Sequence, residues 1–202
     1  MRVDDILHIA RSSGTAIRRA GLRLQAGLLP VGRVVGTVAI NMYPAAGSWG
    51  GSSIFVRQFV AALRRCGLRA VYDLRQPVDV ILLVDPRDDL QNKAFGMEEI
   101  RRYRQRHPAV RILHRINECD QRKDSAFMDD LLRQANEVAD HTVFISSWLR
   151  EYFIARWFDP ARPHSVVYNG ADPAVFHPVG GAVYPGDGVL RLVTHHWSPN
   201  PL

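Results

Sequence analysis

DVILLVD, residues 79–85, is the stretch that decides the fold of this chain. Five consecutive apolar residues between two aspartates present no polar face, and the run is far shorter than the ~20 residues that cross a bilayer. Short runs that are apolar on both faces are typical of central strands in a parallel sheet, which helices cover on both sides. We therefore expect a buried central strand at residues 79–85.

The rest of the chain alternates between strand-like and helix-like patterns. Further strands are predicted at residues 34–40, 69–74, 110–117, 141–146 and 164–169. Helices are predicted at residues 54–66, 97–106, 124–138 and 146–157. Such alternation implies right-handed crossovers between parallel strands. The sequence thus predicts an α/β fold, a Rossmann-like parallel sheet with helices on both faces.

Two local predictions concern the middle of the chain. The helix of residues 124–138 is expected to be capped by Asp124 or Ser125. One side of this helix is expected to be buried, formed by Phe127, Leu131, Ala135 and Val138. His114 lies in the middle of a predicted strand, so we expect it to be a packed core histidine.

Composition and charge exclude some classes of protein. The chain has 202 residues, of which 47% are apolar and 23% charged, as in an ordinary globular protein. Residues 1–33 hold six arginines against two aspartates, which is +4 of the total net charge of +6. A nucleic-acid binder needs a positive face on its folded body, so no nucleic-acid partner is expected.

Residues 1–33 form a basic leader. Between residues 15 and 29 apolar side chains recur at helical spacing, with arginines off that face. Such a helix can lie on an anionic membrane surface, and the alternative is packing on its own domain. We recognise no cleavable signal, and two cysteines are too few for a disulfide framework. The expected location is cytoplasmic, with peripheral contact at the inner face of the membrane through residues 15–29 as one alternative.

Ligands of parallel α/β sheets bind outside the carboxyl ends of the strands, so a site is expected in the loops that follow strands. The first such loop, GSWGGSS at residues 47–53, contains Gly50, Gly51 and Ser52. Glycines let backbone N–H groups approach an anion, and the following helix adds its positive end. The loop matches neither the dinucleotide nor the P-loop pattern. The alternative is a tight turn with Ser52 or Ser53 as the helix N-cap.

The loop RINECDQRKD at residues 115–124 follows a later strand and concentrates polar side chains: Asn117, Glu118, Asp120 and Arg122. Carboxylates in this position could orient substrate hydroxyls or act as a general base. The alternative is a solvated loop with local ion pairs. No histidine is suitably spaced for a metal site, so no metal is expected.

Two blocks further along the chain resemble a known family. They are ADHTVFISSWLREYF at residues 139–153 and VVYNGADPAVFHP at residues 166–178, followed by a predicted linker and a strand at residues 189–195. In this order they resemble the middle of the GT-B glycosyltransferases of the large retaining family four. Gly50 and Gly51 match the glycine pair that follows the first strand in that family. The resemblance covers residues 34–202.

The resemblance implies a domain organisation and an activity. Residues 34–178 would be the Rossmann-like acceptor-side domain, and residues 179–202 the linker and first strand of a truncated nucleotide-sugar domain. The implied reaction transfers a sugar from a nucleoside-diphosphate sugar to a glycan or lipid-linked acceptor, with retention of configuration, as in polysaccharide assembly. It implies no metal and no cofactor besides that donor substrate.

The resemblance also assigns candidate residues by position. The catalytic candidates are Asn117, Glu118 and Asp120, although Asn117 stands where many relatives have a histidine. The substrate-binding candidates are Gly50, Gly51, Ser52, Arg122, Ser146, Asn169 and His196. Helix capping would explain Ser146 equally well.

Most groups that hold the diphosphate in this family belong to the second domain. We therefore expect the 202-residue chain alone to be inactive as a transferase and to bind nucleotide sugars weakly. One alternative is a non-catalytic Rossmann-like module that binds an acceptor or a partner. Another is an unrelated nucleotide-binding oxidoreductase, although the dinucleotide fingerprint of that class is missing.

Overall fold

The computed structural model describes residues 36–45, 51–170 and 186–189. The chain divides into two units, Met1–Asn169 and Gly170–Leu202, and all described helices and strands belong to the first. The predictions for the leader of residues 1–33, for the glycine at position 50 and for the strand and loop of residues 190–202 lie outside the described residues. So does most of the predicted linker.

Six strands form one sheet in which all neighbours are parallel, in the order β2-β1-β3-β4-β5-β6. The strands are β1 (Gly36–Ile40), β2 (Leu68–Val71), β3 (Val80–Leu83), β4 (Arg111–Ile116), β5 (His141–Phe144) and β6 (His164–Val166). Each overlaps a strand predicted from the sequence. The predicted class, an α/β Rossmann-like parallel sheet, is therefore confirmed.

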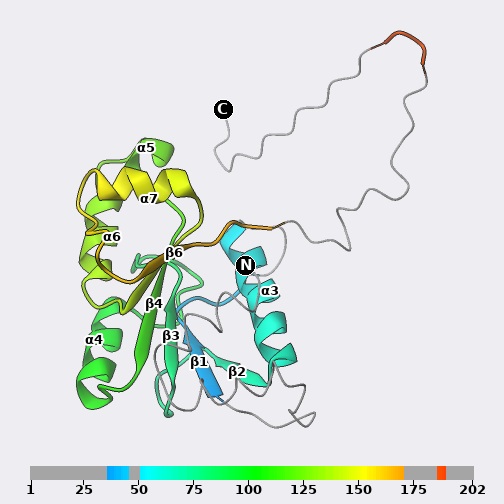
Figure 1. Ribbon diagram of the computed structural model, residues 1–202. Helices are drawn as coiled ribbons and strands as arrows, with labels where there is room; N and C mark the ends of the chain where they lie inside the picture. Colours follow the sequence, from blue (N-terminus) through cyan, green and yellow to red (C-terminus); the bar gives the residue numbers. More distant parts are fainter. Residues whose placement is uncertain (1–35, 46–50, 171–185, 190–202) are drawn as a thin grey trace. The chain divides into compact units, whose positions relative to one another are not determined.

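Helices cover both faces of this sheet. They are α3 (Gly51–Arg65), α4 (Met97–Arg106), α5 (Asp120–Lys123), α6 (Met128–Asn136) and α7 (Ser147–Ile154). Figure 1 shows α3 on one side of the sheet and α4 and α6 on the other. No helix in the described part of the chain is long and apolar enough to span a membrane.

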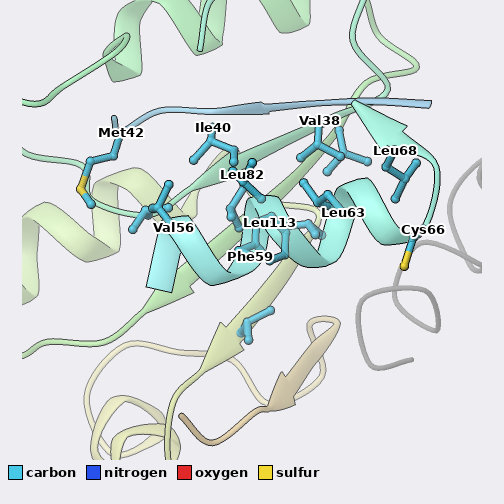
Figure 2. Packing of buried hydrophobic residues seen from close by; sticks show 14 of the residues in the cluster. Val38, Ile40, Met42, Val56, Phe59, Leu63, Cys66, Leu68, Leu82 and Leu113 are labelled. Carbon is cyan, nitrogen blue, oxygen red and sulfur yellow. The ribbon is translucent and has the colours of Figure 1, made fainter. Parts of the chain in front are cut away.

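The central position of β3 follows from its composition. Ile81 pairs in register with a residue of β1 on one side and of β4 on the other, and all four residues of β3 are buried. Val80 and Leu82 belong to the cluster packed under α3, which Figure 2 shows, whereas Ile81 and Leu83 belong to the cluster under α4. Each fully buried side chain of this kind contributes about 1.5–3 kcal/mol to folding.

The start of α3 differs from the prediction. The helix begins at Gly51 and not at Ile54, so neither Ser52 nor Ser53 is its N-cap. Ser53 is buried, and its Oγ accepts a hydrogen bond from the backbone N–H of Ala45, 3.1 Å away. This bond ties the chain that leaves β1 to the first turn of the helix, a contact that the local sequence pattern does not encode.

The region predicted as one helix at residues 124–138 contains the shorter helix α6, and the short helix α5 ends just before this region, at Lys123. Asp124 has left-handed backbone angles (φ 51°) and ends the short α5, so neither Asp124 nor Ser125 caps α6. The helix α6 buries Met128, Leu132 and Ala135. Phe127, expected to be buried, is 58% exposed. The buried stripe is therefore displaced by one residue at its start, because α6 begins later than the prediction placed it.

Asp140, at the entry to β5, links two elements. Its carboxylate accepts two hydrogen bonds from the Arg104 guanidinium of α4, both 2.7 Å, and one from the backbone N–H of Ile112. Partial burial acts to raise the pKa of Asp140, but the bonds from Arg104 and Ile112 outweigh it and hold that pKa below its ordinary value. This pair anchors the C-terminal end of α4 to the sheet.

His114 in β4 is completely buried, as predicted. Its Nδ1 lies 3.0 Å from the side-chain nitrogen of Asn136, which also donates to Thr142, and its Nε2 has no hydrogen-bond partner among the described residues. Burial, with a smaller contribution from the positive charge of Arg162, lowers the pKa of His114 to about 3. The imidazole is therefore neutral at ordinary pH.

Candidate functional site

The carboxyl ends of the parallel strands define one edge of the sheet, which we call the carboxyl edge. The chain passes from β1 outward to β2 on one side and then returns to β3 on the other side of β1. Such a reversal leaves a crevice between the two adjacent strands, and this is where open α/β sheets bind ligands. The crevice of this chain lies beyond β1 and β3.

Asn41, the residue after β1, lies at this reversal of strand order. It is 2% exposed, and its side-chain nitrogen donates to the carbonyl of Asp85, 2.6 Å away. Its side-chain oxygen accepts from the backbone N–H of Val84 at 2.7 Å, and its carbonyl accepts from Ala94. Asn41 therefore holds together the chain segments that leave β1 and β3. The sequence analysis did not identify it.

Asn117 and Ser52, two residues predicted for the site, do lie together. The side-chain nitrogen of Asn117, just after β4, donates to Ser52 Oγ in the first turn of α3 at 3.5 Å. The neighbouring Gly51 has open space where a Cβ would stand. The first turn of α3 carries no acidic side chain, so nothing within it neutralises the positive end of the helix dipole. An anionic group is favoured at this point.

Arg115, two residues before Asn117, is the most unusual side chain near the edge. Its exposed fraction is 4%. Within the described ranges, Arg115 forms no ion pair with a carboxylate. Its guanidinium lies 3.9 Å from the ring centroid of Phe55 in α3, and Nη2 donates to the side-chain oxygen of Asn169 at 3.1 Å. Nη1 is buried and has no hydrogen-bond partner among the residues that the structure describes. Burial lowers the pKa of Arg115 to about 10, so the side chain is still a cation at neutral pH.

Glu118 lies beside two basic side chains of α5. Lys123 Nζ is 3.2 Å from Oε2, and Arg122 Nη1 is 3.6 Å from Oε1. Arg122 also donates to the carbonyl of Asn117 at 3.1 Å. Oε1 of Glu118 is buried and has no hydrogen-bond partner in the described part of the chain. Glu118 is therefore a partly buried carboxylate whose two oxygens face two cations.

Asp120 is engaged in a different way. Oδ1 accepts from Ser125 Oγ and from the backbone N–H groups of Phe127 and Met128, and Oδ2 accepts from the N–H of Asp129, at 2.6–3.1 Å. Burial acts to raise the pKa of Asp120, but these four bonds prevail and lower it. The carboxylate satisfies the free N–H groups at the start of α6. This geometry is that of a helix cap, so we leave Asp120 out of the candidate site.

Two further predicted residues have structural contacts. Ser146 is the N-cap of α7, where its Oγ accepts from the backbone N–H of Leu149 at 3.1 Å. Asn169 is exposed and accepts the bond from Arg115. Capping thus accounts for Ser146, whereas Asn169 connects the end of the first unit to β4.

Arg115 and Asn41 are the site residues that sequence reasoning missed. An arginine inside a strand that is predicted to be buried is a signal, because arginine is almost never fully buried unless it is paired. Asn41 gives a weaker signal, since many polar residues follow strands. Within the described ranges no group of three His, Cys, Asp or Glu side chains could hold a metal ion.

Two comparisons with known proteins give no family for this chain. No protein-family model matches the chain, and no curated protein matches it. The function must therefore be argued from the residues at the carboxyl edge and from the sequence blocks that resemble family-four glycosyltransferases.

Proposed function

We propose that this chain is the acceptor-side domain of a glycosyltransferase that uses a nucleoside-diphosphate sugar as donor. Its acceptor would be a glycan or a lipid-linked saccharide. The observation that carries the proposal is the convergence of Asn117, Ser52 and the buried cation Arg115 at the open N-terminal end of α3. The two family-like sequence blocks support it independently.

The reaction explains why such a set of groups is useful. The acceptor hydroxyl oxygen bonds to the anomeric carbon, the bond from that carbon to the diphosphate oxygen breaks, and the diphosphate leaves with the electron pair. Negative charge therefore develops on the leaving group. The positive end of α3 and the Arg115 guanidinium create a favourable field for that charge. The hydroxyl proton goes to a base, and we assign this role to the carboxylate of Glu118, the residue after Asn117.

Binding without catalysis is the second candidate function. It is favoured by the capping of α6 by Asp120, which removes one of the three predicted catalytic side chains from the site. A non-catalytic module would use Asn117 and Ser52 to hold an acceptor without transferring anything to it.

The proposal is tested with the 202-residue chain by ¹⁵N NMR titration. The ligands are UDP-, GDP- and ADP-linked sugars, neutral oligosaccharides, and NAD⁺ as the ligand of the competing class. We expect a nucleotide sugar or a saccharide to shift the backbone amides of Gly51, Ser52 and Asn117. Asn117→Ala should weaken that binding at least tenfold.

The matched control is Gln134→Ala, which removes an exposed side-chain amide on α6, away from the edge. This variant should bind like the wild type. The proposal is wrong if NAD⁺ binds at the edge while sugars and nucleotide sugars do not. It is equally wrong if none of the sugar ligands shifts the three amides.

A further inference from the structure

The exposed large apolar side chains of the first unit share one location. Those described are Tyr43, Ile54, Phe127, Trp148 and Tyr168, each of them 46–62% exposed. Tyr43 and Tyr168 follow β1 and β6, Ile54 and Trp148 lie in the first turns of α3 and α7, and Phe127 directly precedes α6. All five therefore belong to the carboxyl edge. Exposed apolar groups indicate a binding surface where they lie on neighbouring elements, as Trp148 and Tyr168 do at α7.

Two of these rings, those of Tyr168 and Trp148, are each held in place by contacts at α7. The Tyr168 hydroxyl donates to Oγ of Ser147, the residue before Trp148, at 3.1 Å. The Trp148 ring lies against Tyr152 with centroids 5.3 Å apart. Tyr152 is in turn tied to α6, because its hydroxyl donates to Asp129 at 2.6 Å. Rings that are already positioned lose little conformational entropy when a ligand covers them.

The surroundings of these rings are close to neutral. Arg150 pairs with Glu151, and Arg156 pairs with Asp129, 3.8 Å away, while stacking on the Tyr152 ring. Among the residues that the structure describes, no cluster of unpaired basic side chains therefore surrounds Trp148. An anionic membrane or nucleic acid would need such a cluster. The charge pattern favours a neutral ligand.

We propose that Trp148 and Tyr168 form an aromatic platform that binds neutral sugar rings of a glycan acceptor. The platform rests on the proposed function and names the acceptor class of that same edge. One face of a pyranose carries several C–H groups, which pack against the negative face of an aromatic ring. The indole N–H of Trp148 has no hydrogen-bond partner among the described residues, so it can donate to a sugar hydroxyl.

The platform is placed where an acceptor would need it. Tyr168 directly precedes Asn169, which accepts the hydrogen bond from Arg115, and Arg115 packs on α3. A glycan held on the two rings would therefore extend along the same edge toward Asn117. The rings bind the part of the acceptor that does not react, and the polar groups near α3 receive its reacting end.

The test measures binding of the 202-residue chain to a microarray of neutral and anionic glycans and to vesicles of phosphatidylglycerol and phosphatidylethanolamine. The neutral glycans include malto- and cello-oligosaccharides and dextrans. We expect binding to a neutral glycan, weakened at least tenfold by Trp148→Ala and by Tyr168→Ala. Trp148→Phe should recover part of the affinity, because it keeps a ring but loses the N–H.

Tyr43→Ala is the matched control. Tyr43 is exposed to the same extent as Trp148, 46%, and lies at the same edge but stacks on Tyr72, away from α7. Its loss should change glycan affinity less than twofold. Circular dichroism of each variant establishes that it is folded, which the exposure of all three side chains leads us to expect.

The outcomes separate this inference from the proposed function. The inference is overturned if neutral glycans bind equally well to the Trp148→Ala variant, or if the rings are needed only for vesicle binding. It is also overturned if only anionic glycans, or no glycans, bind. Glycan binding that depends on both rings supports the platform even where nucleotide sugars leave Gly51 and Asn117 unperturbed, a result that would count against the transferase.

Discussion

Replacing Arg115 by methionine should leave the protein as stable as the wild type, or more stable by about 1 kcal/mol. Burial lowers the pKa of this guanidinium from 12.5 to about 10. Since one pKa unit is 1.36 kcal/mol, the folded state carries a cost of about 3 kcal/mol for keeping the charge in its interior. Because a lowered pKa disfavours the cation, this cost is present at neutral pH and is relieved only above about pH 10.

Two contacts offset part of that cost. The hydrogen bond to Asn169 contributes about 1 kcal/mol, and the position over the Phe55 ring about 1 kcal/mol more. Methionine has a similar length, so it leaves little cavity. Removing the cost of burying the charge therefore outweighs the loss of these two contacts by a small amount, so the unfolding free energy should rise slightly. By contrast, truncation of a well-packed core side chain costs about 2–5 kcal/mol.

Urea denaturation at neutral pH, followed by circular dichroism, measures the difference in unfolding free energy. Arg104→Met is the matched control, because the Arg104 guanidinium is paired by two hydrogen bonds with Asp140. Removing it leaves a carboxylate without its partner, so this variant should lose about 2 kcal/mol. A loss of more than 2 kcal/mol for Arg115→Met, as large as that of the control, would refute the reasoning and make Arg115 a structural anchor.

Two other predictions concern the buried side chains of His114 and Asn41. His114 has a pKa of about 3 in the fold and near 6.5 when unfolded, so its contribution to stability is complete above about pH 6.5 and is lost as the pH falls. Wild-type unfolding free energy should therefore drop by about 1.4 kcal/mol between pH 7.5 and 5.5 relative to His114→Gln, measured by urea denaturation; equal pH slopes would contradict this. Asn41→Ala should lower the thermal midpoint by several degrees, the equivalent of about 2–3 kcal/mol, because Val84 and Asp85 lose their partner. Calorimetry measures it, and an unchanged midpoint would argue against Asn41 as the link between β1 and β3.

The sequence predicted the sheet well because its signals are local. The run at residues 79–85 has no polar face, and only the centre of a covered sheet satisfies such a segment. The helix α4 begins at Met97 and ends at Arg106 as expected, with Glu98 and Glu99 in its first turn and arginines in its last. Those residues interact with the dipole of their own helix, so no distant contact is needed to fix its limits.

The predictions from sequence were wrong or incomplete where a distant or irregular contact determines the local structure. Asp120 caps α6 from eight or nine residues away, across the left-handed turn at Asp124, and so displaces the two nearer candidates. The burial of Arg115 depends on Phe55 and on Asn169, which lies 54 residues further along the chain. Pattern reasoning has no access to such pairs. The site could therefore be located at the strand ends, whereas the two contacts that hold Arg115 could not be predicted.

The carboxyl edge has two ends with different electrostatics, and this difference constrains what can bind. At α3, an uncompensated helix N-terminus and a buried arginine favour negative charge. At α7, paired charges and fixed rings favour a neutral, hydroxyl-rich surface. A ligand that is anionic throughout would leave the second end unused, and a wholly neutral one the first. Arg115, bonded to Asn169 and packed on α3, connects the two ends. The proposed pair of ligands, a phosphorylated donor and a neutral acceptor, would use both ends of the edge.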